Sequence, residues 1–132
     1  MVRKLALITL LMFLAAALIP MTAHAGRIGF KNETKSNCYV FKWQSLLWAK
    51  SESKWIPDGP PKTRMVKPRE TSIYEGLIDG IEYVEARKFN DANCSGSSGD
   101  FRRVWHTSAP SAKTTMNVIV DKNNNVTVKQ IR

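Results

Sequence analysis

The sequence predicts an all-β protein, and three observations support this prediction. Apolar and polar residues alternate over several short stretches, as expected for strands with one buried face. Turn-forming residues separate these stretches about every dozen residues. No stretch shows a sustained apolar period of 3.6 residues, which would indicate an amphipathic helix. Seven or eight short strands at this spacing are typical of a single small antiparallel β-sandwich or barrel, and the pattern leaves both architectures open.

The first 25 residues have the parts of a secretory signal peptide. Two cations near the N-terminus precede an apolar run of 15 residues, from Leu5 to Ile19, and Ala23-His24-Ala25 is the small-residue pattern that signal peptidase accepts. A membrane-spanning helix needs about 20 apolar residues, so cleavage after Ala25 is favoured over an uncleaved anchor. The prediction is a signal peptide at 1–25 and a single all-β domain at 26–132.

Removal of the signal peptide leaves 107 residues and lowers the net charge from +9 to +7, because Arg3 and Lys4 are lost. No later stretch is long and apolar enough to span a membrane. The protein is therefore expected to be periplasmic or secreted. In such an oxidising compartment an even pair of cysteines usually forms a disulfide. A bond between Cys38 and Cys94 would close a loop of about 57 residues and contribute roughly 4 kcal/mol in the chain-entropy account.

The expected strands follow one another along the mature chain. Ile28 and Phe30 alternate with polar neighbours in the first strand, and aromatic residues share one face of the second, at 38–44. The segment 45–53 fits either a helical turn or the same strand continuing past a bulge. A proline-rich loop follows at 57–61. Further strands are expected at 63–66, 71–74, 81–89 and 101–107, and a C-terminal hairpin with arms at 116–120 and 126–128.

The composition and motifs argue against most enzyme classes. Once the signal peptide is removed, His106 is the only histidine, so neither a histidine cluster for zinc nor a histidine pair for acid–base catalysis exists. Serine-hydrolase, phosphate-loop, zinc-protease and dinucleotide-binding motifs are absent from the sequence. No metal ion and no cofactor are therefore expected.

One catalytic alternative remains, a small secreted hydrolase of the ribonuclease kind. Glu85 and Arg87 lie two apart on an expected strand and so share one face, and His106 is on the next strand. A carboxylate base, a guanidinium and an imidazole acid could together cleave RNA. Acid–base pairs on strand faces are, however, more often solvated cross-strand partners. The main prediction is therefore a protein that binds without catalysing a reaction.

The tryptophans and basic residues indicate the binding surface. Trp43 and Trp105 are expected in the core, whereas Trp48 and Trp55 flank a polar segment and are expected at the surface. The basic residues expected to contribute to binding are Lys62, Arg64, Lys67, Arg69, Arg102 and Arg103. Such a surface predicts an anionic surface, a glycan or a protein as the partner outside the cytoplasm.

The same residues raise two other possible functions. Specific recognition of nucleic acid is not expected, because none of its known sequence motifs occurs. A secreted toxin or effector acting on a membrane or a target cell is a further alternative, although the chain has no amphipathic helix of the membrane-active kind. Three N-glycosylation sequons, at Asn32, Asn93 and Asn125, fall at expected turns, where a glycan could be accommodated.

Overall fold

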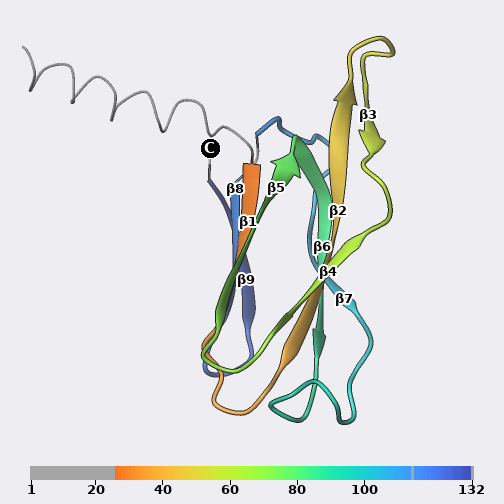
Figure 1. Cartoon of the computed structure of the whole chain (residues 1–132). Coiled ribbons are helices and arrows are strands. Elements are labelled where there is room, and N and C mark those ends of the chain that lie inside the picture. Colours follow the sequence, from red (N-terminus) through yellow and green to blue (C-terminus); the bar gives the residue numbers. More distant parts are fainter. Residues whose placement is uncertain (1–25, 114, 132) are drawn as a thin grey trace, which may run out of the picture.

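The computed structural model describes residues 26–113 and 115–131, so the predicted signal peptide lies outside the described residues. The described chain contains nine strands and no helix. The strands form two sheets that face each other and do not close into a barrel (Figure 1). The all-β prediction is confirmed for these residues, and of the two predicted architectures the barrel is wrong.

The two sheets contain four and five strands. In chain order the strands are β1 (Gly26–Asn32), β2 (Tyr39–Ala49), β3 (Lys54–Pro57), β4 (Lys62–Val66), β5 (Thr71–Ile78), β6 (Gly80–Lys88), β7 (Arg102–His106), β8 (Thr115–Val120) and β9 (Val126–Ile131). The four-stranded sheet has the order β5-β1-β8-β9. In the five-stranded sheet, β2 pairs with β6 along one edge and with both β3 and β4 along the other, and β7 lies beyond β6.

The structure corrects two details of the predicted fold. It has nine strands rather than seven or eight, and the additional strand is β3, which is not among the predicted strands. In addition, β1 and β8 run parallel, whereas an entirely antiparallel fold was expected. Parallel neighbours need a long crossover connection. Here the chain between β1 and β8 includes the whole second sheet, which provides that connection.

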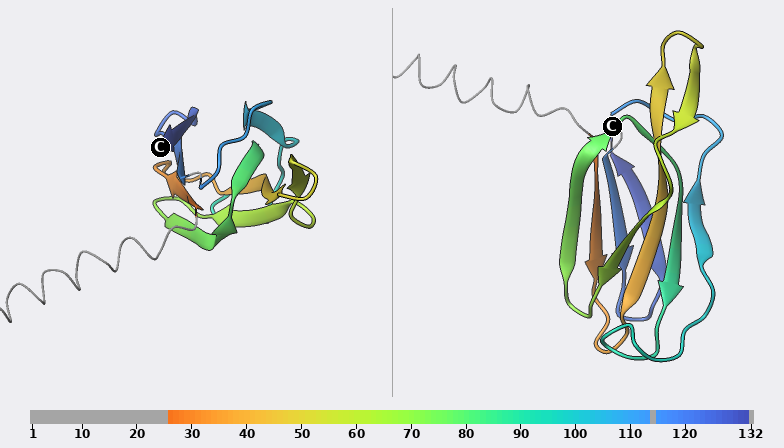
Figure 2. Two further views of the ribbon diagram at one scale, coloured as in Figure 1. Left: turned by 90° about the horizontal axis from the view of Figure 1, so that it is seen from above. Right: turned by 45° about the vertical axis from the view of Figure 1, so that its right-hand side comes forward.

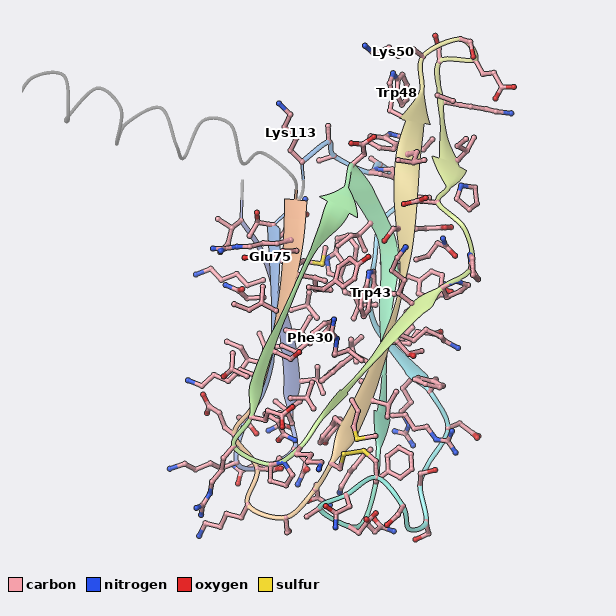
Figure 3. All side chains as sticks on the ribbon, viewed as in Figure 1. Phe30, Trp43, Trp48, Lys50, Glu75 and Lys113 are labelled. Carbon is pink, nitrogen blue, oxygen red and sulfur yellow. A yellow bond between two sulfur atoms is a disulfide. The ribbon has the colours of Figure 1, made fainter. Side chains whose placement is uncertain are left out.

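Aromatic side chains fill the space between the sheets. Phe30 of β1 stacks on Phe41 of β2 with 4.7 Å between ring centroids, and the ring of Trp43 lies 5.2 Å from that of Tyr74. Figure 3 shows Phe30 and Trp43 pointing into this space. Trp43 is fully buried, and Trp105 packs partly buried against the same core. The sandwich is thus held together by side chains that alternate along facing strands.

A buried asparagine joins three segments at the end of β1. The Nδ2 of Asn32 donates to the carbonyl oxygens of Asn37 and Val66, at 2.8 and 3.0 Å. Its Oδ1 accepts from the backbone N and the hydroxyl of Thr34, at 3.0 and 2.7 Å. Because this amide is buried and fully hydrogen-bonded, a glycan has no room at Asn32, and the expectation for that sequon is wrong. The asparagines of the other two sequons are exposed.

The predicted disulfide between Cys38 and Cys94 is present, with 5.1 Å between the two Cα atoms. It joins the residue before β2 to the long loop between β6 and β7. Two backbone hydrogen bonds accompany it, from Cys38 N to the Asp91 oxygen at 2.8 Å and from Phe89 N to the Cys38 oxygen at 2.9 Å. The loop is therefore fixed to the start of β2.

At its other end, β2 extends beyond the rest of the sandwich. The register shifts between Gln44 and Ser45, so the segment 45–53 begins as a strand that continues past an irregularity, one of the two predicted alternatives. Pairing with β6 ends at Leu46, whereas β3 pairs with β2 as far as Ala49. The two strands therefore project as a hairpin, seen at the top of Figure 1 and in the right panel of Figure 2. We call residues 46–57 the finger.

Candidate functional site

The finger carries the two tryptophans expected at the surface. Trp48 and Trp55 are direct cross-strand partners, with ring centroids 5.3 Å apart and ring planes at 66°. Trp48 is 43% exposed. Leu47 and Ile56 are the neighbouring cross-strand pair, and because side chains alternate along a strand they lie on the opposite face of the hairpin. The finger therefore presents apolar side chains on both faces.

The base of the finger is fixed to the sandwich mainly through Trp55. A Cβ atom added at Gly80, the first residue of β6, would lie 3.1 Å from a ring carbon of Trp55. The indole ring thus packs directly on the backbone of that glycine. The backbone N of Trp48 lies 3.4 Å from the Oδ2 of Asp79, and Asp58 N donates to the Ser45 oxygen at 2.9 Å. Trp55 is the inner member of the pair, and Trp48 faces outward.

Lysines lie at the end of the molecule that carries the exposed tryptophan. Trp48, Lys50 and Lys113 lie at the same end of the molecule in Figure 3. The Nζ of Lys54 lies 3.4 Å from a carboxylate oxygen of Glu52 within the finger. Neither Lys50 nor Lys113 forms an ion pair among residues 26–113 and 115–131. Two cations without an ion-pair partner among those residues therefore lie at the end of the molecule that carries the finger.

The structure places the basic residues of β4 away from Trp48 and Trp55, the two tryptophans of the finger. β4 pairs with the half of β2 that lies farther from the finger. The Nζ of Lys62 lies 4.0 Å from a carboxylate oxygen of Asp58, and the guanidinium of Arg64 lies 5.9 Å from the ring centroid of Tyr74. Both cations therefore contact neighbouring side chains of the sandwich and do not extend the surface formed by the finger.

The other four predicted basic residues lie in two further places. Lys67 and Arg69 are exposed in the turn between β4 and β5. Arg102 and Arg103 are consecutive residues of β7, so their side chains point to opposite sides of the strand. Arg103 lies 3.5 Å from the carboxylate of Glu85, whereas Arg102 lines a cleft between the sheets. The predicted basic surface is thus divided over the molecule.

The residues of the catalytic alternative lie on the outer face of the five-stranded sheet. Glu85 alternates with buried neighbours along β6, and His106 of β7 lies opposite Tyr83. The carboxylate of Glu85 is 3.2 Å from the Nζ of Lys42 on one side and 3.5 Å from the guanidinium of Arg103 on the other. This carboxylate thus connects three neighbouring strands.

Arg87 shares that outer face but contacts a different set of groups. Its Nε donates to the hydroxyl of Ser98 at 2.8 Å and to the carbonyl oxygen of Gly99 at 3.0 Å. Its guanidinium also lies over the rings of Phe89 and Phe101. Arg87 therefore holds the loop between β6 and β7 against the sheet, a structural role that accounts for its position.

Two carboxylates organise the loops at the end of the sandwich opposite the finger. Hydrogen bonds from the backbone of Ser95, and then of Gly96, lower the pKa of Asp91 to about 2. The hydrogen bond from the backbone of Asn125 likewise lowers the pKa of Asp121 in the turn between β8 and β9. Both groups are acceptors within their own loops, so they define loop shape.

Among residues 26–113 and 115–131, no group of three or more His, Cys, Asp or Glu side chains could hold a metal ion. None of the elements formed by these residues is a helix with the length and apolar character needed to cross a membrane.

Comparison with known proteins gives distant structural likenesses. No protein-family profile matches the chain, and no curated protein sequence matches it. The chain is similar to a protein from Eubacterium rectale solved by NMR, with 14% identity, a TM-score of 0.39, and coverage of 80% of this chain and 87% of that one. It is also similar to the membrane-binding domain of pneumolysin, with 14% identity, a TM-score of 0.38, and coverage of 81% and 96%. At these scores the likenesses carry no functional argument.

Sequence reasoning identified the tryptophans of the finger but missed its other residues. The segment 46–49, Leu-Leu-Trp-Ala, and the segment 54–57, Lys-Trp-Ile-Pro, stand at equal distances from the polar turn 50–53. A hairpin centred on that turn places the two tryptophans opposite each other and Leu47 opposite Ile56, as observed. This mirrored spacing of apolar residues is the signal that could have revealed the finger.

Proposed function

We propose that the mature protein is an exported, non-catalytic binding module whose finger enters an apolar groove of a protein partner outside the cytoplasm. The observation that carries the proposal is the pairing of Trp48 with Trp55 on a hairpin that projects beyond the rest of the sandwich. Tryptophan combines a large apolar surface with one hydrogen-bond donor, and it is enriched among the residues that dominate protein–protein affinity.

The two apolar faces of the finger favour a partner that surrounds it. Leu47 and Trp48 point to opposite faces and are 36% and 43% exposed. The body of the sandwich lies on one side of the hairpin only, so it could not cover both residues. Exposed apolar patches of this kind mark interaction sites in soluble proteins. A groove that encloses the hairpin would bury both faces at once.

The polar tip of the finger favours a protein groove over the interior of a lipid bilayer. The tip contains Lys50 and Glu52 in the turn and Lys54 at the start of β3. Entry of the tip into hydrocarbon would bury the two lysines at about 3 kcal/mol each. A protein groove can instead leave the tip in water. An acidic rim on that groove would pair with Lys50 and Lys113, in keeping with the basic mature chain.

Capture from the exported fraction of the source cells tests this proposal. The immobilised mature protein is compared with Trp48→Ala and with a control, Ile73→Ala, which removes a side chain that is 50% exposed on the four-stranded sheet. The same partner should bind the wild type and the control, and Trp48→Ala should bind it at least about tenfold more weakly. Equal capture by all three proteins would refute the finger as the binding surface.

Vesicles of phosphatidylcholine and phosphatidylglycerol provide the second arm of this experiment. The tryptophan fluorescence of the wild-type protein is expected to remain unchanged when these vesicles are added. A blue shift that is present in the wild type and lost in Trp48→Ala would identify a lipid surface as the partner. That result would overturn the assignment of a protein groove while keeping the finger as the recognition element.

A further inference from the structure

A second candidate site lies at the end of the sandwich opposite the finger. A cleft of about 360 Å³ opens there between the two sheets, at the edge where β7 faces β9. Tyr39, Val104 and Val126 form its apolar lining. This volume falls within the range of about 300–1,000 Å³ found for small-molecule sites.

One wall of the cleft is held in place before any ligand arrives. This wall is the loop between β6 and β7, which contributes Asn90 and Asp100 to the lining. The disulfide fixes the loop to the start of β2. In addition, Asn90 N donates to the Ser97 oxygen at 3.0 Å, and Gly99 N donates to the Lys88 oxygen at 3.2 Å. A ligand would therefore meet a wall that needs little ordering, which favours affinity.

Tyr39 connects the two sheets inside the cleft. Its hydroxyl donates to the Oδ1 of Asn124, in the turn between β8 and β9, at 3.0 Å. Burial, and to a lesser degree the nearby carboxylate of Asp121, raises the pKa of Tyr39. The hydroxyl therefore stays protonated at neutral pH and keeps a lone pair that can accept a hydrogen bond from a ligand.

Three charged side chains, those of Lys88, Arg102 and Asp100, line the cleft. Lys88 and Arg102 form no ion pair among the described residues, and neither does the carboxylate of Asp100. In the cleft the carboxylate accepts hydrogen bonds, and the amide and ammonium groups donate them. Hydroxyl groups do both, so this combination matches a polyhydroxylated ligand. Two cations and one carboxylate give the cleft one excess positive charge, which matches a ligand that also carries a carboxylate. A guanidinium binds a carboxylate through two parallel hydrogen bonds.

We propose that this cleft binds an acidic sugar, such as a uronic acid unit of a polysaccharide. Arg102 and Lys88 bind the sugar carboxylate. Asp100 and the amide of Asn124 form hydrogen bonds with the sugar hydroxyls. The cleft shares no residue with the finger and lies at the other end of the sandwich, so this inference goes beyond the proposed function and is independent of it.

Titration of the 15N-labelled mature protein by NMR tests this site, with glucuronic acid as the probe. Glucose, which lacks the carboxylate, and acetate, which lacks the hydroxyls, are the matched controls. Glucuronic acid is expected to shift the amide signals of Asp100, Arg102 and Asn124 at millimolar concentrations. Glucose and acetate should each bind about tenfold more weakly or not at all. No shift with glucuronic acid, or equal shifts with either control, would overturn the proposal.

Two neighbouring arginines provide matched variants for the same titration. Arg102→Gln removes the cation of the cleft, and Arg103→Gln removes the next residue, which points to the outer face. Arg102→Gln should weaken glucuronic acid binding about tenfold, and Arg103→Gln should leave it unchanged. Equal affinities of the two variants would contradict the assignment. Because Trp48→Ala should bind glucuronic acid like the wild type, failure of the finger and failure of this site are distinguishable.

Discussion

Trp48 and Trp55 lie opposite each other on neighbouring strands of the finger, edge to face, with 5.3 Å between their ring centroids. The two rings have different surroundings. Trp55 packs on the backbone of Gly80, whereas Trp48 is 43% exposed. The inner ring therefore holds the hairpin in position, and the outer ring is available to a partner.

Substitution of the two tryptophans should affect stability unequally. Trp48→Ala should lower the free energy of unfolding by about 1 kcal/mol, chiefly through loss of the aromatic pair. Trp55→Ala should lower it by about 2 to 3 kcal/mol, because it also leaves a space beside Gly80. Urea unfolding followed by circular dichroism measures both values. A larger loss for Trp48→Ala than for Trp55→Ala would show that the assignment of inner and outer ring is reversed.

Adding one methyl group at Gly80 should displace the inner ring. The new Cβ would lie 3.1 Å from the Trp55 ring and 3.3 Å from the Ser111 carbonyl oxygen, so Gly80→Ala should cost about 1 to 3 kcal/mol through overpacking. Gly99→Ala is the control, because its Cβ would meet no atom within 4 Å. Thermal unfolding compares the two variants. Equal stability of both would mean that Trp55 does not pack on Gly80.

The loss of stability at acidic pH should come in part from protonation of the Asp91 carboxylate. Its pKa in the folded state is about 2, below the ordinary value of 3.8, so the ionised carboxylate favours folding. This contribution is complete above pH 3.8 and is lost as the pH falls through about 2. Asp91→Asn should therefore be less stable than the wild type at neutral pH and lose less stability on acidification. Unfolding curves over this range, with Asp100→Asn as the control, check the prediction.

The carboxylate of Glu85, on the outer face of the five-stranded sheet, should contribute to stability and not to catalysis. Glu85→Gln removes the charge between Lys42 and Arg103, and it should cost about 1 to 2 kcal/mol. His106→Ala, at an exposed position, should change stability by less than about 0.5 kcal/mol.

The wild-type protein should leave RNA intact. RNA cleavage by the wild type that His106→Ala abolishes would instead support the hydrolase alternative.

Much of the fold could be predicted because burial on one face imposes alternation on each strand. Tyr39, Phe41 and Trp43 point inward together because they are two residues apart on β2, as the pattern indicates. The parallel pairing of β1 with β8 could not be predicted, because the choice of strand neighbours depends on contacts between distant segments. β3 escaped prediction because it is only four residues long and combines Lys54 and Pro57 with just two apolar residues.

The candidate sites were harder to predict from the sequence than the strands, because they also depend on contacts between distant segments. Neighbours in sequence need not be neighbours in space: Arg102 and Arg103 are adjacent, yet one lines the cleft and the other pairs with Glu85. Conversely, the cleft combines Tyr39 and Asn124, which are 85 residues apart. Only the packing of the two sheets brings such residues together.

Fluorine NMR of the protein labelled with 5-fluorotryptophan tests the central claim most directly. The chain has four tryptophans, so each can be assigned by substitution and followed when the captured partner is added. The resonance of Trp48 should shift and become protected from solvent, whereas that of the buried Trp43 should remain unchanged. A bound partner that leaves the Trp48 resonance unshifted and exposed would contradict the role of the finger in recognition.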